Sequence, residues 1–316
     1  MTQDNNSTFT PPHPLNTAVL FLIFNRLDTT QQVFEAIRKA KPPKLYIAAD
    51  GARESKEGEV DKVKAVREYI MQNIDWECEV KTLFREQNYG CKMAVSGAID
   101  WFFENEEMGI ILEDDCLPSQ SFFWFCEELL VRYKEDELVY MISGDGRASN
   151  YIDLKNDYDF VSYALIWGWA SWARAWKNYD VKMSDWIDQK KYVLKNISQE
   201  KNTRRYWADA YQMSFDGKID TWDYQWSYTL QKRQALCIVP RVNLITNIGF
   251  GEGATHTCDQ SSNNANIQRE DLNIPLKDPE RILKNLKLNT YYDKFEFNKN
   301  SYLIRVVNKI KKIVGL

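Results

Sequence analysis

Residues 109–118, GIILEDDCLP, run an apolar segment directly into three acids. The apolar part suits a buried strand, whereas Glu113, Asp114 and Asp115 need solvent, a cation or a metal to remain charged there. Carboxylates at a strand end are good ligands for Mg²⁺ or Mn²⁺, which prefer oxygen donors and leave positions for water and substrate phosphates. This arrangement is typical of phosphoryl and nucleotide-sugar chemistry.

The same acids have a plainer explanation, which the sequence leaves open. Solvated turns at protein surfaces often carry several carboxylates. Acids also stabilise the N-terminus of a following helix, and a helix is expected to begin near Ser119. The metal interpretation therefore depends on the elements that position the acids.

Strands and helices are expected to alternate along the first half of the chain. Apolar runs bounded by turn residues predict the strands, and apolar residues at helical spacing predict the helices between them. The expected strands are residues 17–24, 44–49, 78–84, 109–112 and 138–143. This alternation implies right-handed crossovers and an α/β fold with a mostly parallel central sheet flanked by helices.

In parallel sheets, ligands bind at the carboxyl ends of the strands. Polar segments are expected to follow four of the strands at that edge: Asn25-Arg26, Asp50-Gly51, the loop at residues 87–90, and the acidic triplet. The acids therefore lie where a binding site is expected.

The second half of the chain is rich in tryptophan and loses the regular alternation after about residue 144. Its tryptophans either pack a core or form a carbohydrate-stacking platform, and the sequence leaves both open. They are Trp167, Trp169, Trp172, Trp176, Trp186, Trp207, Trp222 and Trp226. We expect a disordered leader at 1–16, a donor-binding half at 17–145, an irregular acceptor and catalytic half at 146–285, and a basic amphipathic helical tail at 286–316.

Composition excludes several classes of protein. The chain has 316 residues of which 44% are hydrophobic, enough for one large or two small domains, and its net charge of -4 does not suggest nucleic-acid binding. No apolar run reaches the roughly 18 to 20 residues that span a bilayer, and the polar start is unlike a signal peptide. The six cysteines form no CxxC pair and are expected to be reduced. We therefore expect a cytoplasmic protein.

The end of the chain combines basic and apolar residues. Residues 301–316 carry Arg305, Lys309, Lys311 and Lys312 and no acid. Such a segment either lies on an anionic membrane, which would make the protein peripheral on the inner face of the plasma membrane, or packs on the body with its basic side in solvent.

A series of motifs resembles the GT-A glycosyltransferases. The motifs are LFLIFNR, IAADGAR, QNYGCKMAVSGAIDWFF, GIILEDDCLPSQSFFWF, VYMISGDGR, YALIWGWASW, TWDYQW and NIGFGEGATHT, in this order over about residues 17–258. They are most similar to bacterial nucleotide-diphospho-sugar transferases and more distantly to the N-acetylglucosaminyltransferase I family. The resemblance implies a Rossmann-like GT-A fold, a nucleotide-sugar donor and Mn²⁺ or Mg²⁺.

The resemblance also implies roles for particular residues. Those implied to hold the nucleotide or its diphosphate are Asn25, Arg26, Asp50, Asn88, Lys92, Glu113 and Asp114. The last acid of the triplet, Asp115, is implied to bind the metal. His256 falls where several GT-A enzymes supply a late metal ligand, although a structural histidine is an equal alternative; with Cys258 alone it is too little for a zinc site.

The catalytic acid of the family lies in a Trp-Asp segment, which points to Asp223 in TWDYQW. This chain departs from the eukaryotic Trp-Asp-Asp-Trp pattern, so Asp220 is kept as a second candidate. An acid there would take the proton from an acceptor hydroxyl in an inverting transfer. A structural acid capping a helix is the alternative interpretation. Trp167, Trp169 and Trp222 are predicted to contact the acceptor.

The sequence therefore predicts a metal-dependent glycosyltransferase of bacterial surface polysaccharide or glycoconjugate synthesis. A UDP-sugar is the first expectation for the donor and a glycan or lipid-linked glycan for the acceptor. One alternative is a sugar nucleotidyltransferase, although FNRLDTT lacks the Gly-rich loop that such enzymes use to hold a triphosphate. The other is a non-catalytic carbohydrate-binding protein.

Overall fold

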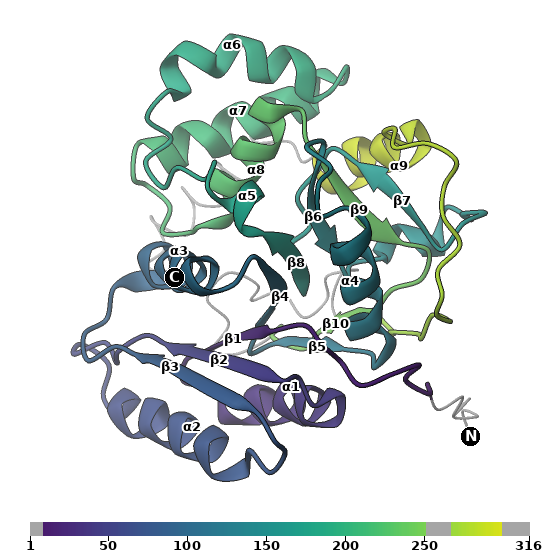
Figure 1. The fold of residues 1–316 in the computed structure, drawn as a ribbon. Coiled ribbons are helices and arrows are strands. Elements are labelled where there is room, and N and C mark those ends of the chain that lie inside the picture. Colours follow the sequence, from purple (N-terminus) through teal and green to yellow (C-terminus); the bar gives the residue numbers. More distant parts are fainter. Residues whose placement is uncertain (1–8, 251–266, 299–316) are drawn as a thin grey trace, which may run out of the picture.

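The computed structural model describes residues 9–250 and 267–298. Its centre is an eight-stranded sheet with strand order β3-β2-β1-β4-β8-β6-β9-β7, flanked by helices on both faces (Figure 1). Six strands point in one direction, and β8 and β7 run antiparallel to their neighbours. The predicted α/β class with a mostly parallel sheet is confirmed.

The first half of the sheet consists of four adjacent parallel strands, β3 (Glu79–Phe84), β2 (Lys44–Ala49), β1 (Val19–Ile23) and β4 (Met108–Glu113). Helices α1 (Leu27–Ala40) and α2 (Glu59–Asn73) cover one face, and α3 (Gly90–Asn105) covers the other (Figure 1). Successive residues of β1 alternate between the two hydrophobic cores, Phe21 facing α1 and α2 and Leu20 facing α3. A strand buried on both faces must be apolar throughout, which explains the run VLFLI.

Four further strands complete the same sheet. They are β8 (Trp169–Trp172), β6 (Val139–Ser143), β9 (Leu236–Pro240) and β7 (Tyr158–Val161), with α4 (Ser121–Arg132) packed near them. A separate ladder joins β5 (Cys116–Pro118) to β10 (Ile245–Asn247) directly after the acidic triplet. The sequence predicted β6, as residues 138–143, and a helix beginning near Ser119. It missed β5, β7, β8, β9 and β10, because strands of three to five residues show little periodicity.

A layer of helices lies over the α3 side of the sheet (Figure 1). It contains α5 (Ala173–Trp176), α6 (Trp186–Ile197), α7 (Lys201–Phe215) and α8 (Asp223–Arg233). Tryptophans and tyrosines of these helices share a core with Leu20 and Met141 of the sheet. Helix α9 (Leu286–Tyr291), a π-helical turn (Tyr292–Glu296) and a 3₁₀ turn (Arg147–Asn150) complete the fold.

The predicted disordered leader is wrong for residues 9–16. Phe9 lies 5.4 Å from the ring of Trp124 on α4, and the indole nitrogen of Trp124 donates a 2.9 Å hydrogen bond to the carbonyl of His13. Leu15 is buried in the core. These contacts hold the segment against α4, which a polar, Pro-containing sequence did not suggest.

The predictions about membrane spans and cysteines can be compared with the structure only for the described residues. Among the described ranges, no helix is both long and apolar enough to cross a bilayer. The five described cysteines are free thiols, while Cys258 and the tail at 301–316 lie outside the described residues.

Candidate functional site

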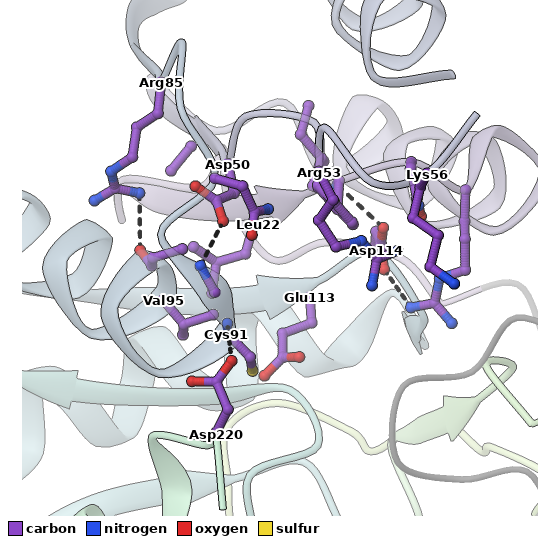
Figure 2. Close-up of a pocket in the computed structure, with 18 residues that line it drawn as sticks. Leu22, Asp50, Arg53, Lys56, Arg85, Cys91, Val95, Glu113, Asp114 and Asp220 are labelled. Atoms are coloured by element: carbon purple, nitrogen blue, oxygen red, sulfur yellow. Dashed lines mark hydrogen bonds and ion pairs between the residues drawn. The ribbon is translucent and has the colours of Figure 1, made fainter. Parts of the chain in front are cut away.

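A cavity of about 550 Å³ opens at the carboxyl ends of β1, β2 and β4 (Figure 2). The turns after the strands supply most of its polar lining, and α3 closes one side. Its charged lining residues are Arg26, Asp50, Arg53, Lys56, Arg85, Glu113, Asp114 and Asp220. Asn25 and Asn88 line it as well. The cavity is therefore at the edge of the sheet where the sequence predicted a ligand.

Asp50 ties the end of β2 to the start of α3. Its carboxylate accepts hydrogen bonds from the backbone N–H groups of Tyr89 at 3.0 Å and Gly90 at 3.1 Å. Asn88 donates from Nδ2 to the carbonyl of Gly51 at 2.7 Å. Burial raises the pKa of Asp50, and the N–H donors oppose that shift. The two loops that form this wall are thus held together by the predicted site residues themselves.

Asn25 and Arg53 are both anchored on Glu59, a buried acid at the start of α2. Glu59 accepts from Asn25 Nδ2 at 2.8 Å and from the backbone N–H of Arg53 at 2.7 Å, and it forms an ion pair with the Arg53 guanidinium. Arg53 is the main reason why the pKa of Glu59 falls to about 2. A charged Glu59 therefore fixes the loop after β2, which carries Arg53 to the cavity rim.

Four cations line the cavity, three of them on loops that the sequence interpretation did not single out. Figure 2 shows Arg53 and Lys56 reaching from the loop after β2 toward Asp114, with Arg85 on the opposite wall. Arg85 donates to the carbonyl of Ala94 on α3 at 2.9 Å. The available sequence signal was their place in the segments that follow two expected strands, and they are the groups that could neutralise a diphosphate.

The acidic triplet carries more negative charge than its protein partners balance. One nitrogen, Arg26 Nη2, lies 2.6 Å from Asp114 Oδ1 and 2.8 Å from Asp115 Oδ2. Glu113 Oε1 is buried, and no described group hydrogen-bonds to it. Burial raises the pKa of Glu113 to about 8, and the charges of Asp115, Asp114 and Asp223 add to the effect. Burial likewise raises the pKa of Asp114 to about 6, against the opposing charge of Arg26. Among the described residues, Arg26 is thus the only cation paired with the three acids of the triplet.

Asp115 lies against the segment that follows β10. Its carbonyl accepts a 2.9 Å hydrogen bond from the N–H of Ile248, and a side chain at position 249 would collide with its carboxylate, so Gly249 is required there. His256 lies outside the described residues. Within the described ranges, no group of three His, Cys, Asp or Glu residues is arranged around a metal position.

A divalent cation nevertheless fits the chemistry of the triplet. The donors are hard oxygens, Glu113 Oε1 has no partner among the described residues, and the negative charge is incompletely balanced. Arg26 now holds the carboxylates of Asp114 and Asp115. Arg26 contacts only one oxygen of each carboxylate, so the other oxygen of each can take a cation.

Asp220 and Lys92 meet at the N-terminus of α3. Asp220 accepts from the backbone N–H groups of Cys91 at 3.0 Å and Lys92 at 3.1 Å, and a Cβ on Gly90 would lie 2.6 Å from its Oδ2. Asp220 thus caps α3 from the segment before α8, which explains its place in the cavity wall. Lys92 is half-buried on the first turn of α3, and its side chain is not part of the cavity lining.

Asp223 is the first residue of α8 and accepts a hydrogen bond from the hydroxyl of Thr221. Its negative charge contributes to the raised pKa of both Glu113 and Cys91, which line the cavity. The predicted base therefore lies close to the acidic side of the cavity.

Two of the three tryptophans predicted to contact an acceptor are core residues. Trp169 and Trp222 are 1% and 2% exposed and stack on each other at 5.5 Å. That part of the prediction is wrong for this conformation, because a platform needs an accessible ring face. Trp167 is half-buried, with the Arg147 guanidinium 4.0 Å from its ring centroid and Phe250 edge-on at 5.8 Å.

Comparison with known proteins finds likenesses among solved structures only. No protein-family model and no curated protein matches the sequence. HddC from Yersinia pseudotuberculosis aligns at 8% identity over 52% of this chain and 80% of HddC, with a TM-score of 0.31. TarS 1-349 from S. aureus aligns at 10% identity over 71% of this chain and 58% of that chain, with a TM-score of 0.38. UDP-glucose pyrophosphorylase complexed with UDP-glucose aligns at 12% identity over 72% and 90%, also at 0.38. These scores do not assign a function to this chain.

Proposed function

We propose that the chain is a glycosyltransferase that moves a sugar from a nucleoside-diphosphate donor to a hydroxyl group of a glycan or lipid-linked glycan. The observation that carries this proposal is the cavity at the carboxyl ends of β1, β2 and β4. It combines four cations on its lining with an incompletely balanced acidic triplet at the end of β4. A diphosphate and its metal ion complement that distribution of charge.

In this proposal the donor contacts both walls of the cavity. Asp50, Asn25 and Asn88 present polar atoms for the nucleoside, with a UDP-sugar as the first candidate. Arg53, Lys56 and Arg85 lie within the same lining to pair with the diphosphate. Arg53 is positioned for this role by its ion pair with Glu59.

Asp115 would hold the metal ion, Mn²⁺ or Mg²⁺, with Asp114 and Glu113 as the neighbouring oxygen donors. The ion would supply Lewis-acid stabilisation of the leaving diphosphate. Arg26 lies in the same lining and contacts both acids through one nitrogen, so it adds positive charge beside the proposed metal position. His256 is kept as a proposed ligand.

Asp223 is the proposed base. Its carboxylate accepts the proton of the acceptor hydroxyl while that oxygen forms a bond to the anomeric carbon. The bond from the anomeric carbon to the diphosphate breaks, and the diphosphate leaves with the electron pair. Attack opposite to the leaving group inverts the anomeric centre. The support for Asp223 is its place at the start of α8, where its charge acts on Glu113.

Donor turnover tests the proposal. Incubation with candidate nucleotide-sugars and Mn²⁺ should release the nucleoside diphosphate slowly, by transfer to water, and faster once a matching acceptor is present. A nucleotidyltransferase would instead release pyrophosphate from a nucleoside triphosphate and a sugar phosphate. A binding protein would turn over neither substrate, and either result would contradict the proposal.

A further inference from the structure

A second basic region lies far from the cavity, between α6 and α7. It is an open cleft of about 660 Å³, and its eight lining residues include five cations and no acid. They are Lys191, Leu194, Lys195, Asn196, Gln199, Lys201, Arg204 and Arg205. Figure 1 shows α6 as the outermost helix of its layer, on the opposite side of the molecule from α1 and α2.

The cations of this cleft are not matched by acids. Across residues 9–250 and 267–298, the ion pairs include no partner for any of the five. Arg204 alone has a clear structural task, since its Nη1 donates to the carbonyls of Ser198 and Gln199 at 2.8 Å each and so closes the α6–α7 turn. Lys191, Lys195 and Arg205 are exposed. An anion bound to this face would offset the mutual repulsion of these cations.

Exposed apolar side chains accompany the positive charge. Ile187 is 60% exposed and Tyr192 is 43% exposed, both on α6. Residues 187, 191 and 195 are four apart and so form one stripe along the helix. Basic residues mixed with accessible aliphatic and aromatic groups suit a lipid interface, where charge meets phosphate and the apolar groups enter the headgroup layer. A soluble phosphate would make no use of Ile187 or Tyr192.

The described chain also ends beside this helix pair. The Phe297 ring lies 5.6 Å from Tyr206 and 4.8 Å from Trp207, both on α7. The sequence that follows, residues 299–316, contains five cations and no acid. The cleft and the sequence of residues 299–316 are therefore both rich in cations and contain no acid.

We propose that the outer face of α6 and α7 docks on the phosphate groups of an anionic lipid bilayer. This inference is independent of the proposed function, because none of the cleft residues belongs to the cavity. It extends the predicted membrane contact from the tail to a surface of the folded body. Docking through this face would keep the protein at the membrane without any spanning segment.

Sedimentation of the full chain with vesicles tests the proposal. Wild-type protein should bind phosphatidylglycerol-phosphatidylcholine vesicles, with little binding to phosphatidylcholine alone and less at high salt. The triple variant Lys191→Gln, Lys195→Gln, Arg205→Gln should lose roughly 100-fold in affinity, since each cation near an anionic surface contributes about 1 kcal/mol. Arg204 is left intact because it supports the turn.

A matched control variant removes the same number of positive charges from the opposite side of the molecule. Lys39→Gln, Lys62→Gln, Lys64→Gln changes three exposed lysines of α1 and α2 and should leave vesicle binding nearly unchanged. Unchanged circular dichroism spectra and melting temperatures in both triple variants would show that they fold. Replacing Arg305, Lys309, Lys311 and Lys312 by Gln in a third variant measures the contribution of the tail.

Three outcomes would overturn the proposal. The first is equal vesicle binding by the cleft variant and wild type, which would place all of the affinity elsewhere, for example in the tail. The second is binding that does not depend on lipid charge. The third is cleft-dependent binding of soluble polyphosphate without any binding to vesicles, which would make the occupant a soluble polyanion.

Discussion

The donor cavity and the α6–α7 cleft both gather basic side chains, but among the described residues acids pair only with cations of the cavity, and there with two of the four. Arg53 pairs with Glu59, and Arg26 pairs with Asp114 and Asp115, whereas the five cleft cations have no such partners among the described residues. Paired cations are held in fixed positions, which a small ligand of defined shape requires. Unpaired and exposed cations suit a large anionic surface that sets no exact geometry. The difference separates a site built for chemistry from a surface built for attachment.

Removing the proposed base should give the largest effect. Asp223→Asn keeps the size of the side chain but cannot accept the proton, so we expect the rate of transfer to fall by about 10²–10⁴ with donor affinity unchanged. Steady-state kinetics of transfer and direct nucleotide titration measure the two quantities. If transfer persists at the wild-type rate, the base is another acid, and Asp220→Asn is the next variant to measure.

Removing the proposed metal ligand should affect the binding of the donor itself. Asp115→Ala is expected to abolish the Mn²⁺-dependent part of nucleotide affinity, and EDTA should do the same to the wild type. Isothermal titration with and without Mn²⁺ provides the measurement. Asp278→Ala, a change at an acid far from the cavity lining, serves as the control. Normal Mn²⁺-dependent affinity in Asp115→Ala would remove this residue from the metal site.

Removing one cation from the cavity rim should weaken nucleotide binding without changing vesicle binding. Arg53→Ala is expected to weaken nucleotide binding by roughly 10- to 100-fold, because hydrogen bonds to charged groups contribute about 1.5–3 kcal/mol. The same variant should bind anionic vesicles as the wild type does. The cleft triple variant should show the reverse pattern. If Arg53→Ala left nucleotide affinity intact, the diphosphate would have to lie against other cations.

Removing the anchor of Arg53 should change stability in a pH-dependent way. The pKa of Glu59 is lowered from 4.5 to about 2, so its ion pair stabilises the fold above pH 4.5 and the contribution is lost as the pH falls toward 2. Glu59→Gln should therefore lower the free energy of unfolding at pH 7 by about 1–2 kcal/mol, a value reduced for the partial exposure of Arg53. Urea denaturation at pH 7 and pH 3 checks this; an equal loss at both values would contradict an electrostatic role.

The first half of the fold could be predicted from the sequence because its strands are buried on both faces. Residues 44–49 form a strand with the predicted bounds, and the other parallel strands differ only at their ends. The later strands could not be predicted in the same way. β8 is four residues long and inserts antiparallel between β4 and β6, a pairing that no local pattern specifies.

The residues of the candidate site could also be predicted only in part. Asp50 and Asp114 were predicted because polar residues after buried strands meet at one edge of the sheet, and both line the cavity. Arg85 follows a strand as well, yet nothing in its type distinguished it from a surface cation. Trp169 and Trp222 were assigned to the acceptor because sequence cannot separate a buried tryptophan from an accessible one.

The central claim is that the cavity at the carboxyl ends of β1, β2 and β4 holds a nucleoside diphosphate together with a metal ion. Its most direct test is a thermal-shift panel of UDP, GDP, CDP and dTDP, each with Mn²⁺ and with EDTA. We expect the melting temperature to rise with one nucleotide, UDP first, and the rise to disappear with EDTA and in Asp115→Ala. No shift with any nucleotide, or an equal shift with EDTA and in Asp115→Ala, would contradict it.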